Sequence, residues 1–504
     1  MNWLRSFLLG VVAAGAVLAG VAPPAAADDR AFVAAVNTHL RKVRAAEQVT
    51  ALSRGDPDAV QRQYDAARDF VEALRAAGGT SDGCRPAAQA AMELAQAEVL
   101  QAEGYDLPDP AVVRAATRRI RAAVRRYNTV AASCTQAGRV ASPRPLVLTS
   151  PVAGQAFFGA VRVAGKAPAG TRWAVATSKN RPAGCETLGA VLRAAKGKVS
   201  GSVALATGPH RLTVTFCGGS AVAPHVIRTA IISDVWVLPD AERQAAAPRK
   251  ESASLDARLV KLSGTFSGIS GIWYHDLSTG TTASWNADAQ FPAASTVKLG
   301  LLVATLERFG VRSPVFYDIH AMAAWSSNLA TNRLLVKVGG SEAGGAAAAQ
   351  AALTRMGAAR STFTGSYRVG TSLQSRGNDP PRISSRVTTA RDLGKMLYLI
   401  HSGAMGSHAA LSILHLTQAE AAVALGLLLS SEPKRDNVGL FRPALGKKTP
   451  AAQKQGWFSV VRHTAAIVYT PTGPKIVVLL TYAPSLSLST AQVYGRSLIR
   501  LLRL

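Results

Sequence analysis

The chain has 504 residues, 48% of them hydrophobic and 17% charged, so it is long enough for several folded domains and too apolar to be largely disordered. Its formal net charge of +27 would suggest a nucleic-acid partner in a cytoplasmic protein. The N-terminal segment indicates export, so we expect no nucleic acid. The alternatives are anionic cell-wall polymers, acidic lipid headgroups, or a generic basic surface without a partner. The oligomeric state is not indicated.

Residues 1–27 have the pattern of a cleaved secretory signal. Arg5 precedes an apolar stretch over residues 7–21, and small residues form an A-x-A cleavage site that ends at Ala27. The apolar stretch is short for a membrane span, which needs about 20 residues, and an uncleaved anchor is the alternative. We therefore expect a secreted, cell-wall-associated protein whose mature chain starts near Asp28.

Residues 28–140 are rich in Ala and Arg, and their apolar residues recur at helical spacing in four runs. This pattern predicts an antiparallel bundle of about four helices. Cys84 precedes the third run and Cys134 ends the fourth, which places both at the same end of an up-and-down bundle. Export allows cysteines to pair, and pairing within one block is the simplest of the three possible connectivities. We expect a Cys84–Cys134 disulfide.

Residues 145–239 change to short β-branched runs between Gly and Pro. They predict a small immunoglobulin-like β-sandwich in which Cys185 and Cys217 bridge strands. This module is either a spacer or binds cell-wall glycan, and the sequence does not separate the two roles. Residues 240–252 are polar, contain proline, and are expected to form a linker.

From residue 253 to 504 predicted strands and helices mix, as in one α/β domain. Ser295 and Lys298 stand three residues apart at the start of an apolar run that predicts a buried helix. Helical side chains at this spacing share a face, with Cβ atoms roughly 5 to 6 Å apart. A lysine with its ordinary pKa of about 10.4 is a poor base near neutrality, but desolvation or a nearby cation lets it accept a proton from serine. This spacing also arises by chance, so further motifs are needed.

Two later motifs support catalysis. The run SSN at residues 326–328 falls in a helical or helix-edge segment, where a hydroxyl could pass a proton to a leaving group and an amide could orient the substrate. The run KQG at residues 454–456 leads into an apolar strand. A lysine there adds positive charge beside the nucleophile, and a glycine lets the substrate approach the backbone closely.

The three motifs in this order resemble the pattern S-x-x-K, S-D-N, K-T-G of class A β-lactamases and penicillin-binding proteins. Residues 271–306 look like that family's second strand, turn and nucleophile helix, and residues 388–400 look like the threonine-capped helix after its omega loop. The strand at 477–484 and the helix at 489–504 are similar to the end of the family's fold. The resemblance covers about residues 253–504 and implies a β-lactamase and transpeptidase-like fold.

The resemblance also implies site roles. Ser295 would be the acylated nucleophile, Lys298 a base or proton relay, and Ser326 the proton shuttle to the leaving nitrogen. An oxyanion hole would be formed by the backbone amides of Ser295 and Trp457. The residues implied to contact substrate are Asn328, Lys454, Gln455, Gly456, Trp457 and Arg462.

A basic site of this kind suits substrates that carry a carboxylate. Lys454 and Gln455 are implied to bind that group, Arg462 is an extra contact, and Asn328 is implied to hold the substrate amide. β-Lactams and the peptidyl-D-alanine ends of peptidoglycan stem peptides both present a carboxylate. They are the substrate classes that the resemblance implies.

The sequence departs from the family pattern at several points. Ser327 replaces the usual aspartate, Gln455 replaces the usual threonine, and the interval from Ser295 to Ser326 is roughly half the usual one. The omega-loop segment, residues 361–382, lacks the expected glutamate and offers only Asp379. We therefore expect acylation with slow hydrolysis of the acyl-enzyme, which is behaviour closer to a penicillin-binding protein than to a resistance enzyme.

Two rival interpretations compete with this one. In the first, the domain is a catalytically silent scaffold in a cell-wall-binding protein. In the second, His463 pairs with Ser459 or an aspartate in a hydrolase triad, but no G-x-S-x-G elbow supports it and a polar histidine at a strand edge is expected instead. No C-x-x-C or H-E-x-x-H spacing occurs, so neither a metal nor a cofactor is expected.

Overall fold

A computed structural model of the chain describes residues 27–52, 56–76, 84–106, 109–134, 148–178, 184–185, 189–219, 224–240, 244–311, 315–367, 386–431, 438–446 and 448–504. The predicted signal peptide lies outside these residues apart from its last position. Within these ranges no single helix is long and apolar enough to cross a membrane. The bent pair α12 (His408–Leu414) and α13 (Gln418–Leu429) passes that test of length and composition together, with 79° between its halves.

The chain divides into two compact units, and the first is helical. Its described residues form α2 (Ala27–Leu52), α3 (Pro57–Ala76), α4 (Arg85–Asp106) and α5 (Pro110–Cys134), each packed on the next. Apolar side chains at helical spacing, among them Val36, Tyr64 and Leu94, are buried between the helices. A disulfide joins Cys84 to Cys134. The predicted helical run and its disulfide are both confirmed.

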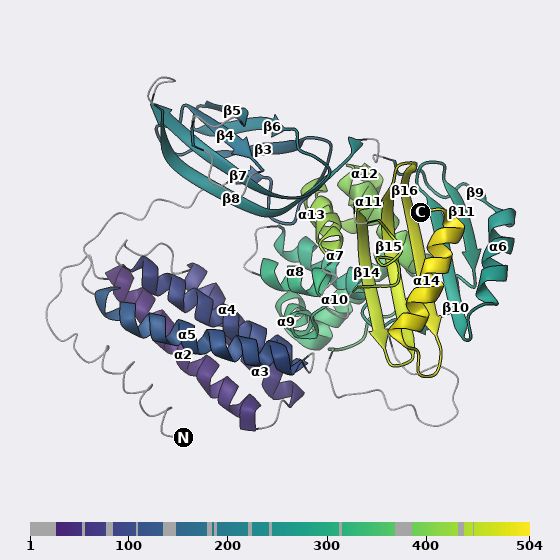
Figure 1. Ribbon diagram of the computed structural model, residues 1–504, viewed down its shortest axis with the longest axis horizontal. Coiled ribbons are helices and arrows are strands. Elements are labelled where there is room, and N and C mark those ends of the chain that lie inside the picture. The colour runs from purple at the N-terminus through teal and green to yellow at the C-terminus, as the bar shows by residue number, and fades with distance from the viewer. Residues whose placement is uncertain are drawn as a thin grey trace. The chain divides into compact units, whose positions relative to one another are not determined.

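The second unit begins with a β-rich module (Figure 1). Its strands are β1 (Leu148–Ser150), β2 (Ala156–Phe158), β3 (Val161–Lys166), β4 (Trp173–Thr177), β5 (Ala190–Ala195), β6 (Lys198–Val203), β7 (Gly208–Gly219) and β8 (Pro224–Leu238). They are hydrogen-bonded in the order β1-β3-β6-β5-β4-β7-β8-β2. Residues such as Val163, Leu192 and Phe216 fill the core, and Cys185 is bonded to Cys217 as predicted. The immunoglobulin-like topology stays a prediction.

The segment expected to be a linker is bound to the α/β domain over its described residues from 244 on. Ala246 N donates to Leu277 O at 2.8 Å, and Ser252 N donates to Thr282 O at 2.8 Å. Between them, β9 (Lys250–Glu251) pairs in parallel with β11 (Thr281–Trp285). The linker over residues 240–252 stays a prediction, but its described residues are attached to the domain, because backbone hydrogen bonds hold a polar segment without requiring apolar side chains.

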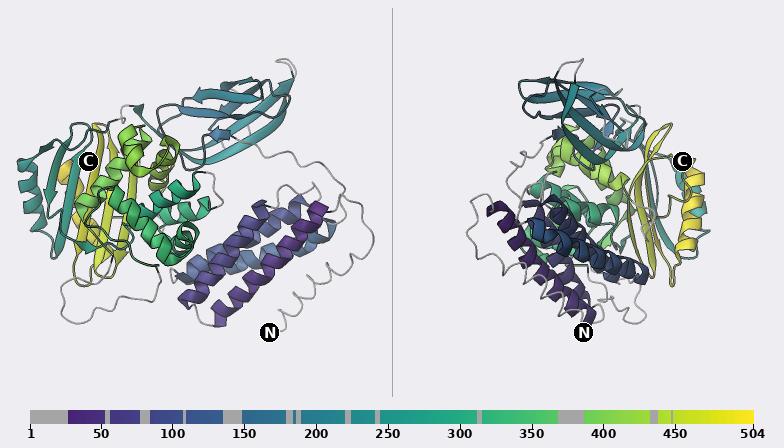
Figure 2. Two further views of the ribbon diagram at one scale, coloured as in Figure 1. Left: turned by 180° about the vertical axis from the view of Figure 1, so that it is seen from behind. Right: turned by 60° about the vertical axis from the view of Figure 1, so that its left-hand side comes forward.

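The α/β domain is built on a six-stranded sheet with the order β14-β15-β16-β10-β11-β9. Besides β9 and β11 the strands are β10 (Ile269–Asp276), β14 (Ala451–Phe458), β15 (Val461–Thr470) and β16 (Gly473–Tyr482). One face is covered by α6 (Ala253–Ser263) and α14 (Leu488–Leu502), with Leu259, Tyr494 and Leu498 in the shared core. The other face carries the helical half of the domain, as Figure 2 shows edge-on.

The helical half contains α12 and α13 together with α7 (Lys298–Phe309), α8 (Phe316–Ala324), α9 (Asn328–Gly339), α10 (Glu342–Arg355) and α11 (Ala390–Ala404). Helix α11 packs on the sheet against β10, β15 and β16. Its N-cap is Thr389, whose side chain accepts a hydrogen bond from Asp392 N, so the predicted threonine-capped helix is confirmed. A short ladder of β12 (Phe291–Pro292) with β13 (Val387–Thr388) joins the start of α11 to the segment that leads into α7.

Candidate active site

Ser295 lies in a tight turn between β12 and the first residue of α7. Thr296 N donates to Ala293 O at 3.1 Å and Lys298 N donates to Ser295 O at 3.3 Å, which are i to i+3 bonds. Ala294, just before the serine, has a φ of 47° in the left-handed region, a conformation that costs energy for a residue with a side chain. The sequence pattern placed Ser295 in the helix, but the helix starts at Lys298.

Lys298 points its ammonium group at three oxygens, although the residue is only 1% exposed. Nζ lies 2.8 Å from Ser326 O, 2.9 Å from Asn328 Oδ1 and 3.4 Å from Ser327 O. A protonated lysine has three N–H donors and no acceptor, so this arrangement fits the charged form. A neutral amine, which has a free lone pair, would give up one contact, and the longest bond is the easiest to lose.

Ser326 and its neighbours form the connection between α8 and α9, as predicted for a helix-edge segment. Ser327 is the N-cap of α9, and its hydroxyl accepts a hydrogen bond from Ala330 N at 3.1 Å. Ser326 has a φ of 62°, which turns the chain sharply between the two helices. This turn directs the carbonyl of Ser326 to Lys298 and its hydroxyl to Lys454.

Lys454 lies on β14 and is 1% exposed. Its Nζ donates to Ser326 Oγ at 2.7 Å and to Gln455 O at 3.2 Å. Burial lowers the pKa of Lys454 to about 7, because a charged group loses its hydration in the interior. Both acceptors are neutral, and none of the described carboxylates forms an ion pair with it. An anion that entered this site would therefore find a desolvated cation without a counter-charge.

Gly456 allows strand β14 to lie against the turn that carries Ser295. A Cβ atom at this position would stand 2.9 Å from both Ala293 O and Ser295 N, and 3.0 Å from Thr296 Cγ2. Two of these atoms belong to the backbone and cannot swing away. The glycine is thus required for the close approach of the strand to the backbone amide of Ser295. Because β14 is an end strand of the sheet, one of its edges pairs with no other strand among the residues that the structure describes.

The side chain of Gln455 is directed away from Lys454. It is 2% exposed, and its Nε2 donates to Ser431 Oγ at 3.1 Å, just after the C-terminal end of α13. Adjacent residues of a strand point to opposite faces, so this separation follows from the local structure. Sequence reasoning did not identify Ser431 as a neighbour of the site. The alternation of side chains along the strand could have indicated that Gln455 and Lys454 contact different partners.

Trp457 and Arg462 stand opposite each other where β14 turns into β15. Trp457 is 41% exposed, and the guanidinium carbon of Arg462 lies 4.8 Å from the centre of its ring, in cation–π geometry. Beyond Gly456, the exposed Trp457 ring and the half-buried Arg462 side chain thus form an aromatic and cationic end to the strand.

His463 contacts the end of β12, just before the turn that carries Ser295. It is buried on β15, where Nε2 lies 2.8 Å from Pro292 O and Nδ1 accepts a hydrogen bond from Thr481 N at 3.2 Å. Nδ1 is therefore the acceptor and Nε2 carries the proton. Burial lowers the pKa of His463 to about 4, so the ring is neutral at pH 7. A polar histidine at a strand edge was expected, but His463 is 1% exposed on β15, which lies between β14 and β16. Both of its ring nitrogens contact backbone groups, so it acts as a structural histidine and the competing triad gains no support.

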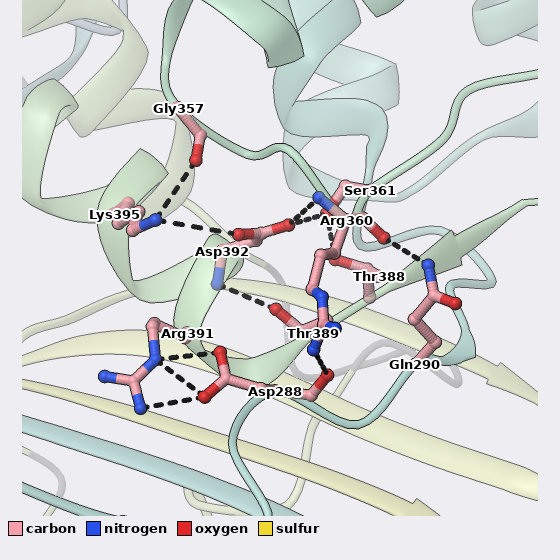
Figure 3. A network of polar contacts seen from close by, with 10 residues as sticks. All are labelled: Asp288, Gln290, Gly357, Arg360, Ser361, Thr388, Thr389, Arg391, Asp392 and Lys395. Atoms are coloured by element: carbon pink, nitrogen blue, oxygen red, sulfur yellow. Dashed lines mark hydrogen bonds and ion pairs between the residues drawn. The ribbon is translucent and has the colours of Figure 1, made fainter.

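A polar network beside the site holds the segments on either side of residues 368–385 (Figure 3). Asp392 Oδ2 accepts hydrogen bonds from Arg360 N and Ser361 Oγ, both at 2.9 Å. Arg391 binds both carboxylate oxygens of Asp288, at 2.9 to 3.1 Å. These bonds connect α11 to the chain before β12, and so to the Ser295 turn. Asp379, the substitute base suggested by the sequence, lies outside the described residues.

The part of the chain that is described contains no group of three or more His, Cys, Asp or Glu that could hold a metal ion. The chemistry available at the site is that of a serine, two buried lysines, a second serine and an amide. Ser295, Lys298, Ser326, Asn328, Lys454 and Gly456 are brought together, and Gln455 is turned away.

Comparison with known proteins gives matches over this half of the chain. A sequence profile of the beta-lactamase enzyme family matches residues 254–313 and 317–500. No curated protein matches the chain. Among solved structures, PBP-A has 18% identity and a TM-score of 0.39, covering 51% of this chain and 99% of its own. A mutant of PBP-A was solved as an acyl-enzyme complex with penicillin G. A beta-lactamase from Streptosporangium roseum has 21% identity and a TM-score of 0.39, covering 50% and 99%.

Proposed function

Because residues 254–500 of this chain belong to the beta-lactamase enzyme family, we propose that it is a serine hydrolase that forms an acyl-enzyme on Ser295. The observation that carries the proposal is the position of Ser326 between two buried lysines. Its carbonyl accepts a hydrogen bond from Lys298 at 2.8 Å and its hydroxyl accepts one from Lys454 at 2.7 Å. The proposed base Lys298 and the proposed shuttle Ser326 are thereby linked with Lys454 in one network, and Ser295 lies one turn before Lys298, whose backbone N donates to Ser295 O.

The proton path follows from the donors and acceptors. Lys298, as the neutral amine, removes the proton of Ser295 Oγ while that oxygen bonds to the carbonyl carbon of the substrate. Lys454 is a donor only, so Ser326 Oγ accepts from it and keeps its own proton for another partner. That proton passes to the leaving nitrogen as the C–N bond breaks, and the proton taken up by Lys298 replaces it on Ser326. The product of this step is the Ser295 ester.

Two backbone amides are proposed to stabilise the oxyanion: those of Ser295 and Trp457. The closeness of Gly456 to Ser295 N supports this, since Trp457 is the next residue on β14. Loss of one such donor costs about 10²- to 10³-fold in rate in enzymes of known mechanism.

The substrate class is proposed from charge. Lys454 is buried without a carboxylate partner among the described residues, so it favours a substrate that carries one. The cation–π pair of Arg462 and Trp457 adds a second cation and an apolar surface at the strand end. β-Lactams and peptidyl-D-alanine stem peptides both fit these requirements. Asn328 is proposed to orient Lys298 and to hold the substrate amide, while Gln455 is proposed to fix β14 from its other face.

We also propose that the protein works outside the cytoplasm, where its two disulfides are stable. The proposed parts are a signal peptide at residues 1–27, a helical bundle at 28–140, an immunoglobulin-like sandwich at 145–239 and the hydrolase domain at 253–504. The strand order β1-β3-β6-β5 followed by β4-β7-β8 supports the sandwich, because it equals the ABED and CFG order of immunoglobulin domains.

The test is intact-mass analysis of the folded protein after exposure to a penicillin. The wild type should gain the mass of one penicillin, and Ser295→Ala should gain none. Ser459→Ala is the matched control, because Ser459 is an exposed serine at the neighbouring hairpin and the nucleophile of the rival triad. An adduct lost in Ser459→Ala would favour that triad. No adduct across several β-lactam classes would favour the silent scaffold.

A further inference from the structure

One face of the β-rich module carries five basic side chains. We define the basic face as Arg162 and Lys166 of β3, Arg193 of β5, Lys198 of β6 and Lys196 in the turn between β5 and β6. All five are exposed. Their strand neighbours Val163, Leu192 and Val199 point to the opposite side and fill the core. The alternation of strand side chains therefore fixes these cations on the solvent side.

The strand register brings like charges together. Lys166 stands directly opposite Lys198 in the β3–β6 pair, and such like-charged pairs destabilise a sheet. The next positions on this face are Ala164, Ser200 and Ser202, which offer no counter-charge.

The five cations have no partners among the described residues. None of them forms an ion pair or a side-chain hydrogen bond there, whereas other arginines of the chain do, such as Arg355 with Glu307 and Arg391 with Asp288. Composition explains the difference. Residues 145–239 hold ten lysines and arginines against two acids, Glu186 and Asp234. An unpaired cluster that includes a repulsive pair is stabilised when a polyanion lies across it.

The residue types on this face decide between the candidate ligands. Neutral glycans are commonly bound by aromatic rings, and β3, β5 and β6 contain no aromatic residue. The nearest one is Trp173, opposite Arg193 on β4, and it packs on the Cys185–Cys217 disulfide. We infer that the basic face binds a linear, phosphate-bearing polymer of the cell envelope. This inference rests on the proposed export but not on the acyl-enzyme, so it can fail or succeed independently.

The experiment measures binding of the full-length protein to long-chain inorganic polyphosphate at low and at high salt. Lys198→Glu replaces the Lys166–Lys198 repulsion with an opposite-charge pair, so its unfolding midpoint should equal or exceed that of the wild type. Its affinity should nevertheless fall by at least about five-fold, the effect of one cation near an anionic surface. Lys261→Glu is the matched control, because Lys261 is an exposed lysine on α6 with the same change in charge. Its affinity for polyphosphate should stay within about two-fold of the wild-type value, because a surface substitution outside the binding site usually has only a small energetic effect.

Each alternative result overturns the inference. Equal weakening by both variants would mean that only the net charge matters. Binding to vesicles that contain phosphatidylglycerol, without binding to polyphosphate, would assign the face to a membrane. Binding to a neutral polysaccharide that is insensitive to salt would indicate glycan recognition. If Lys198→Glu proves less stable than the wild type, the same comparison is made with Lys166→Glu, which changes the other lysine of the pair. Unchanged affinity for polyphosphate in a folded variant would refute the proposal.

Discussion

Nζ of Lys454 donates a 2.7 Å hydrogen bond to the hydroxyl of Ser326. This contact joins the third motif to the second, and the carbonyl of Ser326 continues the network to Lys298. The two lysines must be in opposite states for the proposed reaction: Lys454 charged to bind a carboxylate, and Lys298 neutral to accept a proton. The acylation rate should therefore rise and then fall with pH, and each limb can be assigned by one substitution.

The variant Lys454→Arg tests which group causes the decrease in acylation rate at high pH, the falling limb of the pH profile. Burial lowers the pKa of Lys454 to about 7, so the wild type should lose carboxylate binding above that pH, by about tenfold per pH unit for a single titrating group. An arginine stays charged throughout, and the falling limb should disappear between pH 7 and 9. The measurement is the second-order acylation constant for a penicillin. A variant that keeps the wild-type limb would show that another group controls it.

The rising limb is assigned by Asn328→Asp. Asn328 Oδ1 accepts a hydrogen bond from Lys298 at 2.9 Å, so an aspartate there places a negative charge against the amine. The charge favours the ammonium form, and an opposite charge this close shifts a titration by about 1 to 3 pH units. The rising limb should move to higher pH in Asn328→Asp and stay in place in the neutral variant Asn328→Ser. An unmoved limb in the aspartate variant would exclude Lys298 as the base.

Gly456→Ala tests the approach of β14 to the nucleophile turn. The added methyl would stand 2.9 Å from Ala293 O and Ser295 N, a distance that forces the strand and the turn apart. The proposed oxyanion donor at Trp457 would move with the strand, so acylation should slow by about 10²-fold or more. Gly446→Ala, in a loop where the nearest atom is the Thr449 hydroxyl at 3.3 Å, is the control. Normal acylation by Gly456→Ala would remove this strand from the mechanism.

The order of the three motifs in the sequence led us to expect that their residues meet. Lys298, which follows Ser295, does contact Ser326 and Asn328, and Lys454 contacts Ser326. The catalytic and binding roles of these residues stay predictions. Ser295 was the exception in local structure. The spacing of Ser295 and Lys298 is the same in an α-helix and in a turn with i to i+3 bonds, so sequence could not tell that the helix starts at Lys298. The hydrogen bond between His463 and Pro292 O also could not be predicted from the sequence, since it depends on the order of the strands in the sheet.

Prediction of the fold succeeded where a periodic pattern was long. The four helical runs before residue 140 and both disulfides were expected. Strands β2 and β5 carry a weaker sequence signal than the others, since β2 has three residues and the sequence of β5, AVLRAA, is rich in alanine. The attachment of residues 244–252 to the α/β domain could not be predicted, because backbone hydrogen bonds depend on main-chain atoms and not on residue type.

His463 makes the domain sensitive to acid. Its folded pKa is about 4 and its ordinary value is 6.5, so the unfolded state binds the extra proton first, and stability falls as pH drops from about 6.5 to about 4. At pH 5 the loss amounts to about 2 kcal/mol, at about 1.4 kcal/mol per unit. His463→Gln keeps a donor for Pro292 O and cannot titrate. Its urea midpoint should fall less than that of the wild type between pH 7 and 5, and parallel decreases would refute this role.

Slow hydrolysis of the Ser295 ester is the remaining expectation. The step requires a base directed at a water molecule, and residues 361–382 contain no glutamate, leaving Asp379 or neutral Lys298. The lack of a positioned base typically costs about 10²- to 10⁴-fold, which corresponds to about 3 to 5 kcal/mol of barrier. Stopped-flow experiments with a chromogenic cephalosporin should show a burst near one equivalent and then slow turnover. Rapid linear turnover would contradict this. If that turnover collapsed in Asp379→Asn while acylation persisted, Asp379 would be the base and the protein a working β-lactamase.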